Sequence, residues 1–400
     1  MLTSLRTLYK IGPGPSSSHT MGPFKAAGDF LTLLPVDFDG TVKVTLFGSL
    51  ALTGRGHMTD RIIEKAFGKI PTEIVFDINT KPIHPNTLKF EAVVSGDMIS
   101  ETYLSVGGGT VLRQGQTLIE EEEKYDVDSL ETLKDRLQSI SLRDYVCKCE
   151  GSDIESYLTE ILHAMFMCIE NGLTKTGTVA GTLKVKRVAK EIFELAQAAE
   201  PKEAVMLTLA AYAYAVAEEN SGGFQVVTAP TCGSAGVLPA VLYYLYKYKG
   251  YDEDKLIEGL MAAGLIGLIV KHNATISGAV GGCQAEIGTA TSMAAAALTY
   301  LKGQDLGTVE YAAELAMEHS LGLTCDPVGG YVAIPCIERN AVGALRAYEA
   351  YVMARFIGKA RRNAVTFDEV VAVMAETGRS LPTEYKETSL GGLAKIHKHI

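Results

Sequence analysis

The sequence predicts an α+β fold, in which an N-terminal α/β sandwich domain is followed by a C-terminal all-α domain. Short segments with alternating polar and apolar residues, typical of half-buried strands, fill much of the first 113 residues. Long segments rich in Ala, Leu and Ile, typical of buried helices, follow from residue 151 onward. Because an acidic, polar stretch lies between them, we expect domains at 1–113 and 151–400 joined by a linker at 114–150.

The first domain is expected to combine strands with helices. Three segments rich in β-branched and aromatic side chains predict strands: 41–49, 73–79 and 90–95. Residues 58–68 have helical spacing and end at Gly68, which suits a helix C-cap. The segment YLSVGGGTVL (103–112) contains three consecutive glycines, which indicate a turn or a close approach of the backbone to a ligand: Gly107, Gly108 and Gly109.

The second domain is expected to consist almost entirely of helices. In the linker, the segment SLETLKDRLQSISLRDY (129–145) predicts one polar helix. Beyond it, apolar segments with few strand signals predict helices at 153–170, 182–198, 202–218, 235–248, 254–270, 287–302, 308–320 and 340–357. Several of these segments are apolar on most faces, so other helices must bury them.

Charge and hydropathy argue against several classes of function. The net charge is −10, whereas a general nucleic-acid binder carries a basic surface. The N-terminus lacks the apolar core of a signal peptide, and the longest apolar run, near 256–270, is shorter than the roughly 20 residues of a membrane span. We therefore expect a cytoplasmic protein that acts on a small molecule, without a nucleic-acid or membrane partner.

Two polar loops carry candidate catalytic groups, although familiar nucleotide-binding, zinc-protease and hydrolase motifs are missing. The loop GPGPSSSHTMGP (12–23) gathers hydroxyl groups and His19 between proline and glycine turns, and it offers many donors to an anionic ligand. The loop GSLALTGRGHMTD (48–60) places His57 between a strand and a helix. A histidine that titrates near neutrality is the usual general base, but a structural role remains an alternative for each histidine, including His84.

Three cysteines lie in loops beside glycine or proline. Cys325 and Cys336 occur in GLTCDPVGGYVAIPCIERN (322–340), where a disulfide, a metal site, a nucleophile or two core thiols would each explain them. A reducing compartment disfavours the disulfide. With Cys283, in AVGGCQAEIG (279–288), they form a set of three whose backbone N–H groups and thiolates would suit a [4Fe–4S] cluster with one open iron. Their spacing matches no zinc finger and is not a motif by itself.

The other four cysteines give weaker signals. Cys168 shares a helical face with apolar residues and is expected to be a core thiol. Cys147 and Cys149 flank the linker without further ligands nearby, so a structural role is expected. Cys232 opens a helix in APTCGSAGVLPAVL, where a thiol can acquire a lowered pKa and become functional.

Together these stretches resemble the iron–sulfur-dependent L-serine dehydratases (L-serine ammonia-lyases), in their single-chain form with fused β and α domains. GPGPSSSHTMGP, FGSLALTGRGHMTD and SVGGGTVL resemble the family's β-domain signatures. TAPTCGSAGVLPAVL, ISGAVGGCQAEIGTATSMAAAAL, EHSLGLTCDPVGGYVAIPCIERNA and SLGGLA resemble its α-domain signatures, and only 114–150 lies outside the resemblance. Some members end in a cysteine that can occupy the open iron, whereas this sequence ends in HKHI.

The resemblance implies a lyase of amino-acid degradation and gluconeogenesis that converts L-serine to pyruvate and ammonia. A [4Fe–4S] cluster in the all-α domain would be held by Cys283, Cys325 and Cys336, with its open iron acting as a Lewis acid on the substrate hydroxyl. We expect His57 to remove the α-proton, with His19 as the second candidate or as a group that orients the substrate. The residues expected to hold the carboxylate and ammonium groups are Ser16, Ser17, Ser18, Thr20, Asn86, Gly107, Gly108 and Gly109.

The family also implies a homodimer and a first domain similar to the substrate-effector domain of some phosphoglycerate dehydrogenases. Three other functions remain open. A pyridoxal-phosphate dehydratase would need a Schiff-base lysine, and no lysine lies in an obvious cofactor loop. An aconitase-like hydro-lyase acting on another hydroxy acid or amino acid would share the open iron. A thiol-based metal- or redox-sensing protein would leave the polar N-terminal loop without a purpose.

Overall fold

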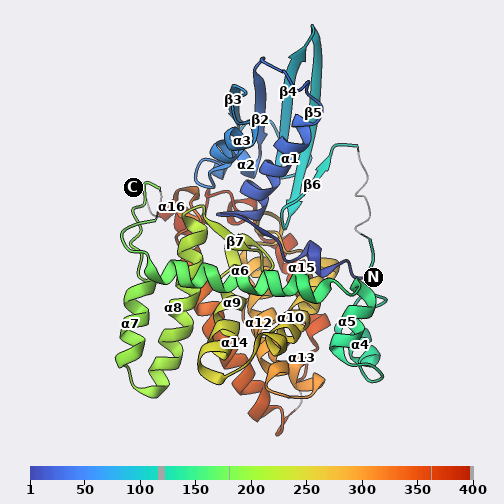
Figure 1. The fold of residues 1–400 in the computed structure, drawn as a ribbon, viewed down its shortest axis with the longest axis vertical. Coiled ribbons are helices and arrows are strands. Elements are labelled where there is room, and N and C mark those ends of the chain that lie inside the picture. The colour runs from blue at the N-terminus through green and yellow to red at the C-terminus, as the bar shows by residue number, and fades with distance from the viewer. Residues whose placement is uncertain (116–121, 180, 362, 397–400) are drawn as a thin grey trace.

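A β-sheet covered by helices stands on a larger helical body in the computed structural model of the chain (Figure 1). The structure describes residues 1–115, 122–179, 181–361 and 363–396. The mixed α+β class expected from the sequence is confirmed, with the larger sheet in the N-terminal part and most helices in the C-terminal part.

The larger sheet has five strands in the order β3-β2-β4-β5-β6. Strands β2 and β3 are parallel, and the other neighbouring pairs are antiparallel. The strand bounds are β2 Val42–Phe47, β3 Thr72–Asp77, β4 Thr87–Val94, β5 Asp97–Gly107 and β6 Thr110–Arg113. The three predicted strands correspond to β2, β3 and β4, whereas β5 and β6 were not predicted.

Two helices, α1 (Gly22–Leu31) and α3 (Thr59–Phe67), cover one face of this sheet. Phe30 and Phe90 stack there with their ring centroids 5.3 Å apart, and Phe67 packs against both rings. Alternate strand residues point into this layer, which explains the alternation in the sequence. Helix α3 ends at Gly68, whose φ of 64° confirms the predicted glycine C-cap. The short helix α2 (Ser49–Thr53) follows β2.

The helical body buries a second and larger apolar core. Its helices are α4 (Leu130–Arg136), α5 (Leu142–Glu150), α6 (Ile154–Thr174), α7 (Ala189–Ala198), α8 (Pro201–Ser221), α9 (Val237–Lys249), α10 (Glu253–Asn273), α11 (Gly278–Gly281), α12 (Thr289–Leu301), α13 (Leu306–Glu318), α14 (Cys336–Ile357), α15 (Phe367–Ser380) and α16 (Gly392–Ile396). Helix α10 is long and apolar enough to cross a membrane by length and composition alone, but 78% of its apolar window is buried inside the protein, as in a core helix.

Several predicted helix limits are wrong. Residues 182–188 are not helical, because the N–H of Val179 donates to the carbonyl of Val185 and closes a loop before α7. The polar helix expected at 129–145 is broken into α4 and α5, since the Ser141 side chain accepts the N–H of Asp144 and caps a new helix. Helix α15 was missed. Leucines of α4 and α5 pack into the core of the helical body, and the domain boundaries stay a prediction.

The first residues of the chain belong to the helical body, although they precede the sheet. Leu5, Leu8 and Tyr9 are fully buried in its core, and the Tyr9 hydroxyl donates to the carbonyl of Leu260 at 2.9 Å. Strand β1 (Ile11–Pro13) then pairs antiparallel with β7 (Gln225–Val227). The chain enters the sheet layer only after the serine-rich loop, so this loop lies between the two parts.

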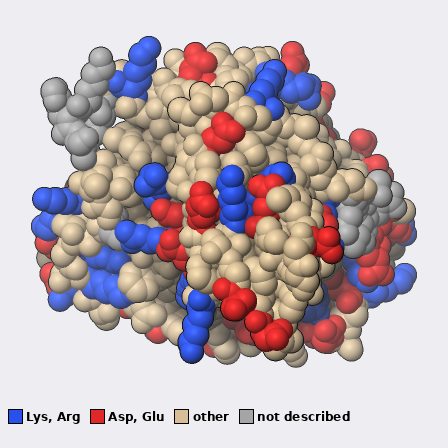
Figure 2. Space-filling model, turned by 90° about the horizontal axis from the view of Figure 1, so that it is seen from above, with Lys and Arg blue, Asp and Glu red and all other residues tan. Residues whose placement is uncertain are grey.

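The outer surface carries charges of both signs. Seen from the sheet end of the molecule, lysine and arginine side chains are interspersed with aspartate and glutamate (Figure 2). On this face the described residues therefore mix charges of both signs.

Candidate active site

A small buried cavity lies where the sheet layer meets the helical body, and residues from both parts line it. His57 and Ser16 come from the N-terminal part, and the three loop cysteines come from the helical part. Two acidic residues complete its polar lining, Glu286 and Glu387. The structure therefore brings together the residues that the sequence predicts to bind the cluster and to abstract the proton.

Two glycines allow the two parts to approach closely beside this cavity. A Cβ atom on Gly56 would lie 2.3 Å from the carbonyl oxygen of Gly330, which has a positive φ of 74°. Neither position tolerates a side chain without displacing backbone. The loop that carries His57 is thereby held against the turn Val328–Gly330, between Cys325 and Cys336.

The three cysteine thiols converge on the cavity from three separate segments. Cys283 precedes a π-helical turn (Gln284–Gly288), Cys325 lies in a loop, and Cys336 begins α14. All seven cysteines of the chain are free thiols. Hydrogen bonding with Cys325 and the nearby Arg339 guanidinium lower the pKa of Cys283 to about 6 against the effect of burial. The pKa of Cys325 is raised by its hydrogen bond with Cys283 and by burial, and burial also raises the pKa of Cys336.

This donor set fits an iron–sulfur cluster. The buried thiols of Cys283 and Cys325 and the half-buried thiol of Cys336 line one cavity, and sulfur is the ligand that such clusters require. Arg339 supplies a positive charge beside Cys283, and it is held there by the carbonyl of Thr324 and by Asp326. Buried thiols are costly to ionise without a cation, so metal binding is the state in which all three would be thiolates.

His19 is held by hydrogen bonds at both of its ring nitrogens. It lies in a π-helical turn (Ser17–Met21) whose first N–H groups are capped by Ser16. Ser49 donates its hydroxyl proton to the carbonyl of Glu387, so it must accept from Nε2–H of His19 at 3.0 Å. Nδ1 of His19 then accepts from Ser18 at 2.9 Å. Both ring nitrogens are occupied in a neutral ring, and burial lowers the pKa of His19 to about 4.

His57 differs because one ring nitrogen faces the cavity. Its Nδ1 lies 2.9 Å from the carbonyl oxygen of Thr53, which only accepts, so Nδ1 carries the proton. In the neutral ring, Nε2 is then a lone pair, 3.4 Å from the Glu387 carboxylate. The Thr20 hydroxyl donates to the backbone carbonyl of His57, and the His19 ring stacks on the His57 ring at 4.4 Å.

The two acidic residues were not predicted as site residues. Glu286 accepts the Thr231 hydroxyl at 2.6 Å, and burial raises its pKa well above the usual value. Glu387 lies within 3.6 Å of Nδ1 of His19 as well as near His57. Burial raises the pKa of Glu387, but the two histidines outweigh it, so that the net pKa is lowered. Glu286 lies in the stretch CQAEIG, and Glu387 lies just before SLGGLA. The sequence pattern around them nevertheless indicated no role for either residue.

Of the described residues that were expected to bind substrate, Ser16 alone lines the cavity. Ser18 and Thr20 hold the two histidines, and Ser17 is buried in the same turn. Asn86 is buried near this loop, and its Oδ1 has no hydrogen-bond partner among the described residues. The glycines Gly107, Gly108 and Gly109 pack against Ser277, Ile276 and Met21 instead of lining the cavity.

Cys232 is fully buried and contacts the sulfur of Met21 at 3.4 Å. Burial raises its pKa, so the lowered pKa suggested by its helix N-terminal position is not found. Cys168 lies in the apolar core, as expected.

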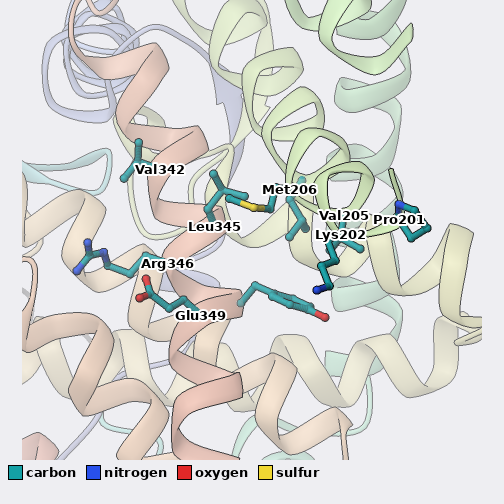
Figure 3. Close-up of a pocket in the computed structure, with 10 residues that line it drawn as sticks. Pro201, Lys202, Val205, Met206, Val342, Leu345, Arg346 and Glu349 are labelled. Atoms are coloured by element: carbon teal, nitrogen blue, oxygen red, sulfur yellow. The ribbon is translucent and has the colours of Figure 1, made fainter. Parts of the chain in front are cut away.

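A larger hollow of about 700 Å³ lies on the surface between α8 and α14 (Figure 3). Apolar side chains such as Met206, Val342 and Leu345 line most of it, and Lys202, Arg346 and Glu349 also belong to its lining. No histidine or cysteine lines this hollow among the described residues, so the buried cavity is the better candidate for the chemistry.

Known proteins match the chain over nearly its whole length. The family described as serine dehydratase beta chain matches residues 4–68, which include both histidines of the site. The family described as serine dehydratase alpha chain matches residues 92–394, which include the three cysteines and Glu387.

Curated relatives agree with these matches. An L-serine dehydratase of Streptomyces coelicolor is 38% identical and aligns over 98% of this chain and 99% of its own. An L-serine dehydratase of Helicobacter pylori (strain J99) is 37% identical over 99% of both chains, and L-serine dehydratase TdcG of Escherichia coli (strain K12) is 37% identical over 97% of both. The chain therefore belongs to the serine dehydratase family.

Proposed function

We propose that this chain is an L-serine dehydratase, which eliminates water from L-serine and releases pyruvate and ammonia. The observation that carries the proposal is the buried cavity in which His57 faces three thiols across the junction of the two parts. The full-length similarity to enzymes named L-serine dehydratase supports the same substrate.

Cys283, Cys325 and Cys336 would hold the iron–sulfur cluster. When bound there, a [4Fe–4S] cluster with one open iron supplies a Lewis acid for the departing hydroxyl group. Arg339 would offset part of the negative charge of the thiolates, because it lies beside Cys283.

His57 would remove the α-proton of the substrate. Its Nε2 lone pair faces the cavity, and Thr53 and Thr20 fix the ring and its backbone. His19 would act as a positioning group, since both its nitrogens are occupied. Loss of the α-proton and the β-hydroxyl gives aminoacrylate, which tautomerises to an imine and is hydrolysed to pyruvate and ammonia.

The polar loop would hold the substrate carboxylate. Ser16 lines the cavity, and Ser17, Ser18 and Thr20 are buried in the same turn. Asn86 is buried beside Ser105, whose hydroxyl donates to the carbonyl of Ser18. The glycine turn at 107–109 would act indirectly, by packing the sheet layer against the segment around Ser277.

We also propose that the enzyme is a cytoplasmic homodimer with an N-terminal substrate-contacting domain at 1–113, a linker at 114–150 and a catalytic domain at 151–400. The family resemblance supports this arrangement. Light scattering of the purified protein would test the dimer, with a monomer at working concentrations as the contrary result.

Anaerobic reconstitution with iron and sulfide, followed by a pyruvate assay on L-serine, tests the function. We expect turnover by the wild type and loss of both turnover and bound iron in Cys325→Ser. Cys147→Ser, which alters a half-buried thiol of α5 outside the cavity, is the matched control and should remain active. Unchanged turnover in Cys325→Ser would contradict the proposed ligand set. A panel with L-threonine and D-glycerate would separate an amino-acid enzyme from a hydroxy-acid hydro-lyase.

A further inference from the structure

We propose that the carboxylate of Glu387 binds the α-ammonium group of the substrate, and so makes the site select amino acids over hydroxy acids. This inference rests on the proposed L-serine dehydratase function and deepens it. Glu387 is a buried acidic residue that lines the cavity and belongs to the C-terminal part of the described chain.

Backbone hydrogen bonds hold Glu387 beside the loop that carries Cys325. The N–H of Cys325 donates to the carbonyl of Tyr385 at 2.8 Å, and the N–H of Glu387 donates to the carbonyl of Cys325 at 2.7 Å. Glu387 has a positive φ of 59°, which is uncommon for a residue with a side chain and costs conformational energy. Two hydrogen bonds and a strained backbone therefore direct this side chain into the cavity.

Among the described residues, the carboxylate has no permanently charged partner within the cavity. Its Oε1 lies 3.4 Å from Nε2 of His57 and 3.6 Å from Nδ1 of His19, and its Oε2 has no hydrogen-bond partner among the described residues. Of the described residues that line the cavity, none is a lysine or arginine. A buried carboxylate of this kind requires a donor, and an ammonium group brings three N–H donors with a positive charge.

The position also suits the chemistry. The ammonium group and the α-hydrogen of an amino acid are bonded to the same carbon atom. A substrate whose ammonium group is held by Glu387 therefore presents its α-hydrogen near Nε2 of the adjacent His57. Its β-hydroxyl can then point to the three cysteines, which line the same cavity.

A metal ion held by His19, His57 and Glu387 is the competing occupant, because their ligand atoms all lie within 4.8 Å of one another. The hydrogen-bond chain argues against it, since both nitrogens of His19 are already engaged with Ser18 and Ser49. Only two ligands would remain for the ion, fewer than the usual protein sites provide.

The test compares two unreactive ligands on the reconstituted holoenzyme. L-Alanine and L-lactate both lack the β-hydroxyl and differ in the ammonium group, so calorimetry isolates the contribution of that group. For Glu387→Gln we expect L-alanine affinity to fall by about 10- to 100-fold, the range of a charged hydrogen bond, with L-lactate affinity unchanged or improved. Glu384→Gln, an exposed change of the same charge on the same segment, should bind both ligands as the wild type does.

Several outcomes would overturn the inference. Equal L-alanine affinity in Glu387→Gln and wild type would do so while pyruvate formation by the wild type still supports the proposed function. A stoichiometric divalent metal beyond the cluster iron, lost in Glu387→Gln, would assign the position to a metal. If Glu387→Gln fails to fold or loses the cluster, Glu387→Asp keeps the charge on a shorter side chain. It should weaken L-alanine binding several-fold more than L-lactate binding, and an equal effect on both would refute the proposal.

Discussion

At the scale of single residues, hydrogen-bond partners distinguish the two histidines of the site. Both are buried and their rings are stacked, so position alone does not separate a base from a supporting group. His19 has a donor on one ring nitrogen and an acceptor on the other, whereas His57 uses only Nδ1 and leaves Nε2 toward the cavity. Only His57 can therefore take up a substrate proton without breaking a hydrogen bond.

We expect His57→Ala to lower kcat for pyruvate formation from L-serine by about 10²–10⁴-fold, the usual contribution of a general base. Iron and sulfide contents should remain near those of the wild type, because His57 is not one of the proposed ligands. His163→Ala, which removes an exposed histidine of α6 paired with Glu253, is the control and should retain full activity. A kcat within a few-fold of the wild type for His57→Ala would exclude it as the base.

The sequence indicated the site residues whose side chains have unusual chemistry. Thiols and imidazoles beside glycine and proline stand out, which is why the three cysteines, His19 and His57 were found. Glu286, Arg339 and Glu387 belong to residue types that are common on any protein surface. Their roles arise only because the fold places Glu286 and Glu387 in the lining of the cavity and Arg339 beside Cys283, and such placement cannot be seen in a single sequence.

A buried carboxylate away from the cavity makes stability depend on pH. Glu218 of α8 is fully buried, and burial raises its pKa to about 7 although the N–H groups of Val188 and Ala189 donate to Oε1. Its Oε2 has no partner among the described residues. Between pH 4.5, its ordinary pKa, and about 7, the folded state keeps this proton and the unfolded state has lost it. The contribution of Glu218 to stability therefore falls as pH rises through this window, by at most about 1.4 kcal/mol per pH unit.

Glu218→Gln should remove that contribution, because an amide oxygen can still accept from both N–H groups and does not titrate. Denaturant unfolding of the apoprotein at several pH values between about 4.5 and 7 would measure the difference in slope between the variant and the wild type. Glu203→Gln, an exposed change on the same helix, should keep the wild-type slope. Parallel slopes for Glu218→Gln and wild type would show that Glu218 titrates normally.

At the scale of elements, irregular turns carry the chemistry and regular elements position it. One π-helical turn precedes α1 and carries His19, and another precedes α12 and carries Glu286. Such turns redirect side chains at the start of a helix and are frequent at functional sites. The loop of His57 and the turn before Cys336 then meet at Gly56 and Gly330.

Gly56→Ala should move the His57 loop, because the new Cβ would lie 2.3 Å from the carbonyl oxygen of Gly330 and backbone would have to shift. We expect a loss of about 1–3 kcal/mol in unfolding free energy and of up to roughly 10²-fold in kcat/KM, the cost of a misplaced catalytic group. Denaturant unfolding and the pyruvate assay would measure both.

Gly28→Ala provides the control for this substitution. Gly28 lies in α1, where an added Cβ meets nothing within 4 Å, so alanine should raise stability by about 0.5–1 kcal/mol and leave activity unchanged. If Gly56→Ala behaved like Gly28→Ala, the close approach of the two loops would not matter for the site.

Elements were predictable where one face is uniformly apolar. Strand β2 alternates between buried positions and exposed or half-buried ones, whereas β5 mixes polar residues on both faces and was not predicted. The start of α7 depends on a hydrogen bond within the preceding loop, and the break between α4 and α5 depends on a serine cap. Such local hydrogen bonds compete with helical periodicity, which alone cannot place an element's end.

At the scale of the whole molecule, both ends of the chain cross between the two parts. The first residues pack in the helical body before β1 leads into the serine-rich loop, and the C-terminal segment returns to lay Glu387 beside Cys325. The sequence predicted the order of a sheet part and a helical part but not these crossings, because they join residues that are far apart in the chain. The site is thus assembled from segments that are adjacent only in the folded protein.

The N-terminal crossing makes a prediction about stability. Leu8 is fully buried, and its Cδ2 lies 2.7 Å from where a Cβ on Gly267 would stand, so it packs closely on α10. Leu8→Ala should lower the unfolding free energy by about 2–5 kcal/mol. Unfolding of the helical body would be followed by its far-UV circular dichroism, because residue 8 packs in that body although it precedes the sheet. Val36→Ala, at a fully exposed position in the sheet part, should change the unfolding free energy by no more than about 0.5 kcal/mol. Equal unfolding midpoints for the two variants would mean that the helical body is stable without the N-terminal segment. The serine-rich loop would then have to be held in place by the sheet layer alone.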